Sequence, residues 1–265
     1  MSRVVRVAVN GATGRMGRTL VELLQGDPRF ALVAAVTTQA HAGAPIIAGS
    51  ALRCAHDWKQ LGALDVVIDF STPAGLDDAL AHCLAHKVAL IVGTTGLEAD
   101  TLKRLDEATR DIAVLRAANF SLGIAVLARL LRAAAGALRA WDVEIVETHH
   151  AGKVDAPSGT ALLLGEAAAA ARDTSLAHAA VYARHGRIGP REPDSIGFAV
   201  VRGGDVIGEH TALLLGPGER IELTHRAGDR SIFARGAIEA AHWLAGKPAG
   251  AYALEDMLAE RVECI

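Results

Sequence analysis

The chain has 265 residues, of which 51% are hydrophobic, and its formal net charge is −3. This length and composition allow one large domain or two smaller ones with substantial cores. The balance is slightly acidic and there is no long basic run, so we expect no nucleic acid partner. Charges or glycines interrupt every apolar run and the first residues lack the apolar stretch of a signal peptide, so we expect no membrane association.

The cysteines are few, odd in number and far apart: Cys54, Cys83 and Cys264. This spacing gives neither a disulfide framework nor a metal signature, and it fits a reducing compartment. We therefore expect a cytoplasmic protein.

The first part of the chain alternates β-rich runs with helical stretches. Strands are predicted over residues 4–9, 32–36, 65–70, 88–92 and 112–115. Helices are predicted between them over residues 15–25, 73–86 and 98–110. Strands that alternate with helices indicate right-handed crossovers and a parallel sheet covered on both faces. This order predicts a Rossmann-like, doubly wound α/β fold.

A glycine-rich loop at residues 10–17, Asn-Gly-Ala-Thr-Gly-Arg-Met-Gly, follows the first predicted strand and opens the first predicted helix. That is the context of a dinucleotide phosphate loop. Thr13 fills the middle glycine position of Gly-x-Gly-x-x-Gly, so the pattern here is Gly-x-x-Gly-x-x-Gly. We expect Gly11 to make the sharp turn, Gly14 to let a phosphate approach the backbone, and Gly17 to let the helix pack closely.

The end of the second predicted strand bears on the choice of cofactor. Thr37-Thr38-Gln39 contains no acid to bind the ribose of NADH, and Arg15 and Arg18 lie in the neighbouring loop and helix. This arrangement favours NADPH. Two alternatives stay open: the arginines are solvated surface charges, or the threonine hydroxyls let NADH bind as well.

Small and hydroxylated residues follow three other predicted strands, at the edge where ligands bind in open α/β sheets. They are Phe70-Ser71-Thr72, Gly93-Thr94-Thr95-Gly96 and Ala117-Ala118-Asn119-Phe120. One such turn alone is ordinary loop chemistry. Their shared position predicts that the cofactor passes close to them.

The pattern changes after residue 120. The predicted elements are a helix over 122–138, a strand over 141–146 and a helix that begins at residues 158–160. They continue with strands over 195–202, 206–215 and 220–226. Gly-Gly-Asp at 203–205 and Gly-Pro-Gly at 216–218 are expected to be tight turns between consecutive strands. We expect a second, α+β domain with a mixed or antiparallel sheet. A final helix over 232–245 is predicted to precede a short tail.

The segment at residues 147–160, Glu-Thr-His-His-Ala-Gly-Lys-Val-Asp-Ala-Pro-Ser-Gly-Thr, concentrates groups that bind anions and move protons. His149 and His150 can exchange protons near neutral pH, and Lys153 adds a positive charge. Ser158-Gly159-Thr160 opens a helix whose unpaired N–H groups suit a carboxylate or phosphate.

Taken singly, these features are ordinary, because a histidine pair is often a surface accident and Ser-Gly-Thr is a common N-cap. Together in one short loop they favour a site for an anionic small molecule. Zinc is less favoured, because the histidines are adjacent and no cysteine lies nearby. We therefore expect no metal.

With these motifs the chain resembles the 4-hydroxy-tetrahydrodipicolinate reductase family, also called dihydrodipicolinate reductase, of bacterial lysine and diaminopimelate biosynthesis. The stretches that match span nearly the whole chain and are GATGRMGR from Gly11, DFSTP from Asp69, GTTG from Gly93, ANFSLGI from Ala118, ETHHAGKVDAPSGTA from Glu147, RGGDVIGEHT from Arg202, ELTHRA from Glu222 and FARGAIEAAHW from Phe233. The His-His-x-x-Lys-x-Asp-Ala-Pro-Ser-Gly-Thr stretch is highly specific to the family.

The resemblance implies hydride transfer from NADPH or NADH to a cyclic imine or enamine dicarboxylate, which yields tetrahydrodipicolinate with loss of water. It implies that His149 gives or takes a proton and that Lys153 donates one. The residues expected to bind the substrate are His150, Lys153, Ser158, Gly159 and Thr160. The residues expected to bind the cofactor are Gly11, Ala12, Thr13, Gly14, Arg15, Met16, Thr37, Thr38, Phe70, Gly93, Thr94, Thr95, Ala117, Ala118, Asn119 and Phe120.

Some members of this family have an acid where Thr37 stands, so this departure bears on NADH preference and not on the reaction. The resemblance further implies a homotetramer formed through the sheet of the second domain. It also implies that the C-terminal helix returns to the first domain. The expected domains are therefore residues 1–120 with 229–265, and residues 121–228.

Two other functions compete with this interpretation. An aspartate-semialdehyde dehydrogenase would share the layout, but it needs a nucleophilic cysteine, and none of the three cysteines lies in a convincing nucleophile motif. A non-catalytic dinucleotide sensor would have no need for His149 and Lys153 together.

Overall fold

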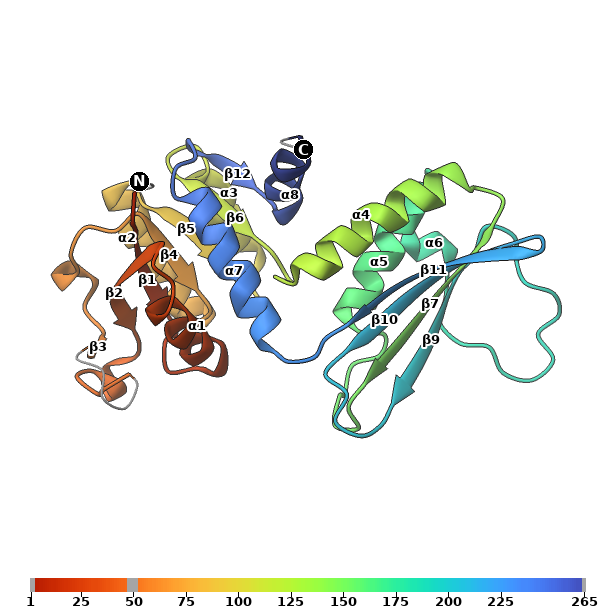
Figure 1. The fold of residues 1–265 in the computed structure, drawn as a ribbon, viewed down its shortest axis with the longest axis horizontal. Helices are drawn as coiled ribbons and strands as arrows, with labels where there is room; N and C mark the ends of the chain where they lie inside the picture. The colour runs from red at the N-terminus through yellow and green to blue at the C-terminus, as the bar shows by residue number, and fades with distance from the viewer. Residues whose placement is uncertain (1–2, 47–51, 264–265) are drawn as a thin grey trace. The chain divides into compact units, whose positions relative to one another are not determined.

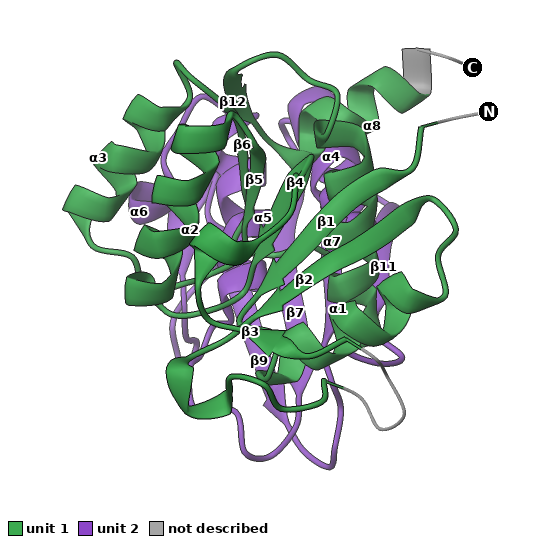
Figure 2. Cartoon of the chain, turned by 90° about the vertical axis from the view of Figure 1, so that its left-hand side faces the viewer, with its two compact units in different colours: residues 1–121, 231–265 green, residues 122–230 purple. Residues whose placement is uncertain are grey.

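The computed structural model describes residues 3–46 and 52–263, and Figure 1 shows the order of the elements along the chain. The chain divides into two compact units, coloured separately in Figure 2. Unit 1 comprises Met1–Ser121 and Ser231–Ile265, and unit 2 comprises Leu122–Arg230. Cys54 and Cys83 are buried free thiols, whereas Cys264 lies outside the described residues.

Unit 1 is built on a seven-stranded parallel sheet with the order β12-β6-β5-β4-β1-β2-β3. The strands are β1 (Val5–Asn10), β2 (Phe30–Val36), β3 (Cys54–Ala55), β4 (Val66–Asp69), β5 (Ala89–Val92), β6 (Ala113–Arg116) and β12 (Gly250–Tyr252). Every residue of β4 and β5 is buried, as expected for strands that are covered on both faces. The predicted doubly wound α/β fold is confirmed.

Helices cover both faces of this sheet. They are α1 (Arg15–Gln25), α2 (Pro73–His86), α3 (Ala99–Ala108), α7 (Ser231–Leu244) and α8 (Leu254–Glu263), with short 3-10 turns at Gln39–His41 and Trp58–Gln60. α1 packs with α7 on one side of the sheet, and α2 packs with α3 on the other (Figure 2).

The α2 boundaries follow from local chemistry. The Thr72 side chain accepts a hydrogen bond from the Gly75 N–H, and Pro73 occupies the first turn, where a missing N–H costs nothing. The helix ends at His86, and the left-handed conformation of its C-cap residue, Lys87, closes the last turn.

The segment after α7 corrects one expectation. It was expected to be a short tail, but it forms β12, which pairs in parallel with β6, and then α8. β12 has only three residues, which is too few for a periodic pattern in the sequence. The pairing itself adds the seventh strand to the sheet.

Unit 2 has a mixed sheet with the order β11-β10-β7-β9-β8. The strands are β7 (Asp142–His149), β8 (Ala180–Val181), β9 (Ile196–Arg202), β10 (Glu209–Gly216) and β11 (Glu219–Arg226). β10 is antiparallel to β7 and β11, whereas β9 is parallel to β7 and β8. Apolar residues of β7, β9 and β10 form a core with α4 (Leu122–Ala137), α5 (Gly159–Ala170) and the short α6 (Leu176–Ala179).

The two predicted turns of this sheet have different outcomes. The turn at 216–218 joins neighbouring strands as expected, because Gly216 pairs with Glu219 and Gly218 has the positive φ of +79° that such a turn requires. The turn at 203–205 does not join neighbours, because β7 lies between β9 and β10. The expectation of consecutive strands side by side is wrong there, since insertion of β7 buries its apolar face against α4 and α5.

Candidate active site

The functional cluster of unit 2 grows out of the core face of β7. Alternate residues of a strand point to the same face, and Val143 and Ile145 on that face are fully buried in the core. Continuing the alternation places Glu147 and His149 on this buried face, where they are 1% and 8% exposed. The strand therefore carries an acid and an imidazole directly out of an apolar core.

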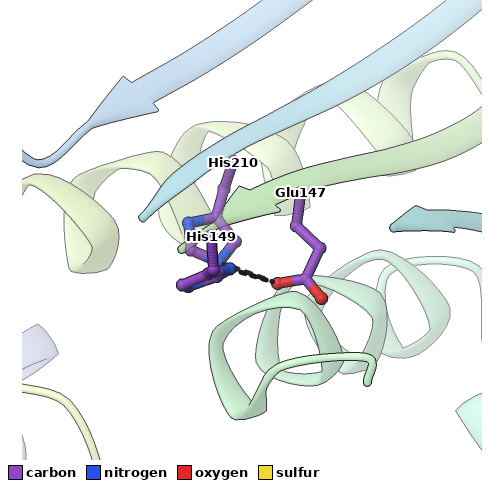
Figure 3. Close-up of side chains that lie close together, drawn as sticks. All are labelled: Glu147, His149 and His210. Atoms are coloured by element: carbon purple, nitrogen blue, oxygen red, sulfur yellow. Dashed lines mark ion pairs between the residues drawn. The ribbon is translucent and has the colours of Figure 1, made fainter. Parts of the chain in front are cut away.

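His210 joins this pair from the neighbouring strand. In the β7–β10 ladder His210 lies opposite Glu147, and its ring meets the His149 ring edge to face with centroids 5.1 Å apart. The His149 Nδ1 lies 2.9 Å from the Glu147 Oε2, and the His210 Nε2 lies 3.8 Å from the same oxygen (Figure 3). The three side chains form one buried cluster, which we call the histidine cluster.

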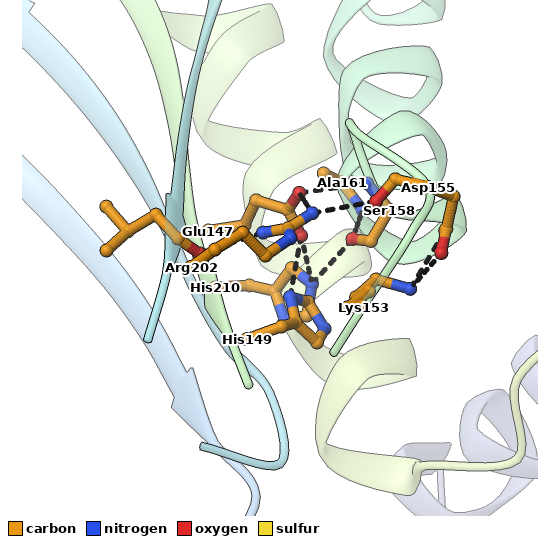
Figure 4. Close-up of polar contacts among 9 residues, drawn as sticks. Glu147, His149, Lys153, Asp155, Ser158, Ala161, Arg202 and His210 are labelled. Carbon is orange, nitrogen blue, oxygen red and sulfur yellow. Dashed lines mark hydrogen bonds and ion pairs between the residues drawn. The ribbon is translucent and has the colours of Figure 1, made fainter. Parts of the chain in front are cut away.

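The other carboxylate oxygen of Glu147 is occupied. Its Oε1 accepts hydrogen bonds from the Ser158 backbone N–H at 3.0 Å and from the Arg202 guanidinium at 2.9 Å (Figure 4). Ser158 is the N-cap of α5, and its hydroxyl accepts from the Ala161 N–H and lies 3.1 Å from the His210 Nε2. Strand β7, strand β9 and the start of α5 are thus tied together by one carboxylate.

Lys153 lies in the loop between β7 and α5. Its Nζ donates to both carboxylate oxygens of Asp155 at 2.7 and 2.8 Å. Asp155 is also linked to Arg202, which donates to its backbone carbonyl at 2.8 Å. The ammonium group of Lys153 is therefore paired with a carboxylate of its own loop.

Burial sets the protonation of the cluster. Loss of solvent lowers the pKa of His149, although the adjacent Glu147 carboxylate opposes that shift. The same loss of solvent, together with the nearby His149, lowers the pKa of His210 to about 4. Burial alone would raise the pKa of Glu147, but the hydrogen bonds from Ser158 and Arg202 outweigh it and lower that pKa. At neutral pH the cluster holds a carboxylate beside an uncharged His210.

The histidine cluster also has the donor set of a metal site. One ligand atom from each of Glu147, His149 and His210 lies within 4.8 Å of the others. The surroundings oppose a dication, because Arg202 contacts Glu147 directly and the His210 Nε2 already faces the Ser158 hydroxyl. The absence of a metal therefore stays a prediction.

The other residues expected to bind the substrate lie near this cluster in sequence. His150 is half-buried at the end of β7, Gly159 is exposed at the first turn of α5, and Thr160 follows it. Ser158 is 3% exposed, and its hydroxyl and N–H both have partners within the chain, so its contact with the substrate stays a prediction.

Unit 1 has a cavity of about 430 Å³ at the carboxyl ends of β1, β2 and β4. Residues that line it are Asn10, Gly11, Thr13, Gly14, Val36, Thr37, Thr38, His56, Trp58, Phe70, Ser71, Thr72, Ala74, Gly75 and Asp78. This is the edge at which open α/β sheets bind ligands. Six of the residues expected to bind the cofactor line the cavity; Arg15 is exposed on the adjacent first turn of α1.

The structure shows the local geometry of the three glycines in the loop at residues 10–17. Gly11 has a φ of +79°, and a side chain there would strike the Phe70 backbone. A side chain on Gly17 would strike the Gly11 carbonyl, so this glycine lets α1 start against the loop. A Cβ on Gly14 would meet only the Gly11 carbonyl, at 3.2 Å, which leaves its other side open to the cavity.

A buried polar network supports this edge of the sheet. Asp69 is fully buried and accepts hydrogen bonds from the side chains of Asn10, Ser71 and Thr94 at 2.6, 2.6 and 2.5 Å. Burial raises the pKa of Asp69, although these hydrogen bonds oppose the rise. As a member of this buried network, Thr94 holds the loop after β4 in place.

The remaining residues expected near the nicotinamide lie on the next strand ends. The Phe70 and Phe120 rings are 5.3 Å apart, and a side chain on Gly93 would strike the Phe70 ring. Thr95 follows Thr94, and the Asn119 side chain accepts a hydrogen bond from the Ser121 N–H at 2.8 Å. Ala117 and Ala118 follow β6. Phe70 lines the 430 Å³ cavity, whereas Gly93, Thr94, Thr95, Ala117, Ala118, Asn119 and Phe120 lie outside its lining.

Several participants were missed in the sequence. Glu147 stands in the motif at residues 147–160, and the motif alone predicts no role for it, although its spacing of two from His149 on a strand signals a shared face. Arg202 and His210 lie more than 50 residues along the chain, so no local pattern joins them to His149. Trp58 and His56 follow β3, which is too short to be seen in the sequence.

Comparison with known proteins identifies the family. The family model described as dihydrodipicolinate reductase, N-terminus, matches residues 5–120, and its C-terminal counterpart matches residues 123–258. The chain belongs to the dihydrodipicolinate reductase family. The expected enzyme class, an NAD(P)H-dependent oxidoreductase of lysine and diaminopimelate biosynthesis, is thereby confirmed.

Curated relatives match over almost their full length. The 4-hydroxy-tetrahydrodipicolinate reductase of Caulobacter vibrioides is 44% identical, with 97% of this chain and 98% of the relative covered. The enzyme of the same name from Pseudomonas fluorescens is 45% identical, with 96% and 98% covered.

Solved structures show the same fold. Dipicolinate-bound dihydrodipicolinate reductase from Paenisporosarcina sp. TG-14 superposes with a TM-score of 0.78 at 24% identity, covering 96% of this chain and 99% of that one. The DAP dehydrogenase of C. glutamicum in complex with DAP has a TM-score of 0.55 at 15% identity, covering 97% and 94%. Among the described residues, no helix has the length and apolar character needed to cross a bilayer.

Proposed function

We propose that this protein reduces 4-hydroxy-tetrahydrodipicolinate to tetrahydrodipicolinate. The nicotinamide cofactor supplies a hydride, a protein acid supplies a proton, and the substrate loses water, so that NAD(P)⁺ and water are the other products. The observation that carries the proposal is the buried pairing of His149 with Glu147 beside Lys153, in a chain that matches both halves of the family.

His149 is the proposed proton donor to the reduced ring. Burial lowers the pKa of His149, which makes its imidazolium a stronger acid, and a positioned donor of this kind contributes roughly 10²- to 10⁴-fold to the rate. Lys153 is the proposed second donor and the main cation for a substrate carboxylate. To act, it exchanges its bond with Asp155 for one with the substrate.

The second substrate carboxylate is proposed to bind at the first turn of α5. Gly159 is exposed there, and no atom lies within 4 Å of the position that a Cβ would take. Gly159 and Thr160 form the start of α5, where the positive end of the helix dipole favours an anion. His150, on the adjoining end of β7, completes the proposed carboxylate site. Ser158 supports this site from inside as the cap of α5.

The test of the reaction is cofactor oxidation in the presence of a synthase that condenses pyruvate with aspartate semialdehyde. NADPH or NADH should be consumed only when that product is supplied. His149→Gln should lower kcat with little change in cofactor affinity, whereas Lys153→Ala should lower kcat and raise KM. A folded wild-type protein without turnover would refute the reaction, and full activity of His149→Gln would refute its role.

The cofactor site is proposed to prefer NADPH. Thr37 is 9% exposed and its hydroxyl lies 2.8 Å from that of Thr13, so little of its surface is accessible to a ribose hydroxyl. Arg18 is exposed, and its Nε donates to the Thr13 carbonyl at 3.0 Å, which keeps its charge beside the loop. Such a charge suits the 2′-phosphate of NADPH.

Titration of both cofactors at fixed ionic strength tests this preference. We expect NADPH to bind roughly ten- to a hundredfold more tightly, in line with about 1–3 kcal/mol for a charged hydrogen bond. Thr38→Glu should reverse the preference, because Thr38 is exposed and lines the cavity, whereas Thr37→Glu would bury a carboxylate. Gly14→Val should weaken both cofactors alike. Equal affinities of the wild type would refute the preference.

The protein is further proposed to act as a homotetramer in the cytoplasm. Val200, Val201 and Ile221 leave 37%, 47% and 37% of their surfaces exposed on strands β9 and β11. Apolar side chains that a sheet leaves exposed favour burial against another copy. Light scattering on the purified protein measures the mass directly, and a monomer would refute this proposal.

A further inference from the structure

Glu147 has one oxygen committed to the scaffold and the other free to act on His149. Its Oε1 holds the Ser158 N–H and the Arg202 guanidinium, so the carboxylate cannot swing away from its place. Its Oε2 is buried and has no aligned hydrogen bond among the described residues. That oxygen lies 2.9 Å from the His149 Nδ1 (Figures 3 and 4).

The separation is that of a hydrogen bond, but the two groups are not aligned for one, so the present interaction is chiefly electrostatic. Bonds to a reacting imidazole are often poorly aligned without substrate and tighten when it binds. A carboxylate on Nδ1 selects the tautomer that carries its proton there. The Nε2 on the far edge of the ring is then the atom that exchanges protons.

There is space beside the Nε2 of His149 because residue 208 is a glycine. Gly208 is buried just before β10, and a Cβ built on it would lie 3.0 Å from the His149 Nε2. Any other residue at this position would crowd the Nε2. The His210 ring packs against the His149 ring from the side and limits its rotation.

We propose that Glu147 is a positioning residue for His149: its carboxylate fixes the ring with Nδ1 turned inward, stabilises the imidazolium, and leaves Nε2 beside Gly208 as the atom that delivers the proton. The inference rests on the proposed function of His149 as the proton donor. It adds a residue and a reacting atom to that function.

Among the charged groups around His149, Glu147 has the largest effect on the protonation of its ring. Glu147 and Asp155 favour the protonated ring, whereas Lys153 and Arg202 oppose it. Asp155 is exposed and already paired with Lys153, so those two charges largely offset each other. His210, facing from β10, stays neutral above a pH of about 4. Removal of the Glu147 charge therefore leaves Arg202 unopposed beside the imidazole.

Glu147→Gln is the test, because the amide keeps the size of the side chain and an oxygen for the Ser158 N–H while removing the charge. A charge within 4–6 Å shifts a pKa by about 1–3 units. We therefore expect the limb of the kcat–pH profile that reports loss of the His149 proton to move down by at least about one pH unit. At pH 8 we expect kcat to fall by roughly tenfold or more, with KM for NADPH nearly unchanged.

Glu144→Gln is the matched control. Glu144 lies on the same strand, is paired with Arg184 and Arg191, and is five residues from His149. Loss of its charge should lower stability and leave the pH limb where the wild type has it. If Glu147→Gln does not fold, Glu147→Asp keeps the charge on a shorter side chain, and it should lose rate while retaining the wild-type limb.

The outcomes separate the two proposals. If His149→Gln loses its rate and Glu147→Gln keeps the wild-type pH limb, the positioning role is refuted and the function of His149 stands. If His149→Gln keeps its full rate, the proposed function of His149 itself fails. A limb that moves equally in Glu144→Gln and Glu147→Gln would also refute the positioning role, because a distant charge would then have the same effect.

Discussion

The histidine cluster places a carboxylate and two imidazoles, all less than 10% exposed, next to an apolar core. Buried polar groups are tolerated when they satisfy one another, and here one carboxylate contacts Ser158, Arg202 and His149. The fold loses stability when Glu147 or His210 must bind a proton inside this buried cluster. The pH therefore affects the fold as well as the reaction.

His210 gives a test of this at the scale of one residue. Its pKa of about 4 in the folded chain lies below the ordinary value of 6.5, so the unfolded chain binds its proton more readily between these values. The stability that the neutral ring contributes is complete above pH 6.5 and is lost as the pH falls towards 4. At about 1.4 kcal/mol per pKa unit, the loss approaches roughly 3 kcal/mol.

The measurement is the free energy of unfolding in urea at several pH values from 7 down to 4. His210→Gln keeps a polar group near the Ser158 hydroxyl and has no proton to gain, so its stability should decline less steeply than that of the wild type. Part of the slope should remain, because burial also lowers the pKa of His149 and His225. Identical slopes would contradict this account of His210.

At the scale of elements, α5 depends on one residue for its start and for its place beside β7. Ser158 caps the helix through its hydroxyl, and its N–H donates to Glu147 on β7. The helix that binds the proposed substrate carboxylate is therefore fixed to the strand that carries His149.

Ser158→Ala should lower the free energy of unfolding by about 1–2 kcal/mol, because it removes the cap and the contact with His210. Ser175→Ala is the control, since Ser175 precedes α6 as its N-cap without a side-chain cap bond. Its cost should stay within about 0.5 kcal/mol. Chemical denaturation of both variants decides the matter, and equal costs would show that the Ser158 hydroxyl contributes nothing beyond an ordinary serine.

At the scale of the whole molecule, the two units keep separate cores and separate candidate sites. The cavity proposed for the cofactor is lined only by residues of unit 1, and the histidine cluster belongs to unit 2. Each ligand should therefore stabilise mainly the unit that binds it.

Hydrogen–deuterium exchange tests this division. NADPH at about 100 times its Kd should stabilise the binding-competent fold by about 2.7 kcal/mol and slow exchange in residues 10–17 and 70–75. Dipicolinate, as a dicarboxylate probe, should slow exchange in residues 147–160. Gly14→Val should abolish the first effect and preserve the second. Protection of the unit 2 segment by NADPH alone would contradict the division.

The sequence by itself determined the features that depend on short-range pattern. Short β-rich runs, helices of period 3.6 and the glycine spacing of the phosphate loop are visible within about 20 residues, so the α/β fold and the Gly11, Gly14 and Gly17 positions could be predicted. The motif around His149 was visible for the same reason. The family resemblance added the reaction, which composition and periodicity cannot supply.

Only the tertiary structure decided which distant groups meet. β7 inserts between β9 and β10 because its alternate apolar residues must be buried, and that pairing brings Arg202 and His210 to Glu147. It also assigned Ser158 to an internal cap, paired Lys153 with Asp155, and added β12 and α8 to unit 1. These outcomes depend on contacts between segments far apart in the chain, where burial and charge, and not local propensity, select the partners.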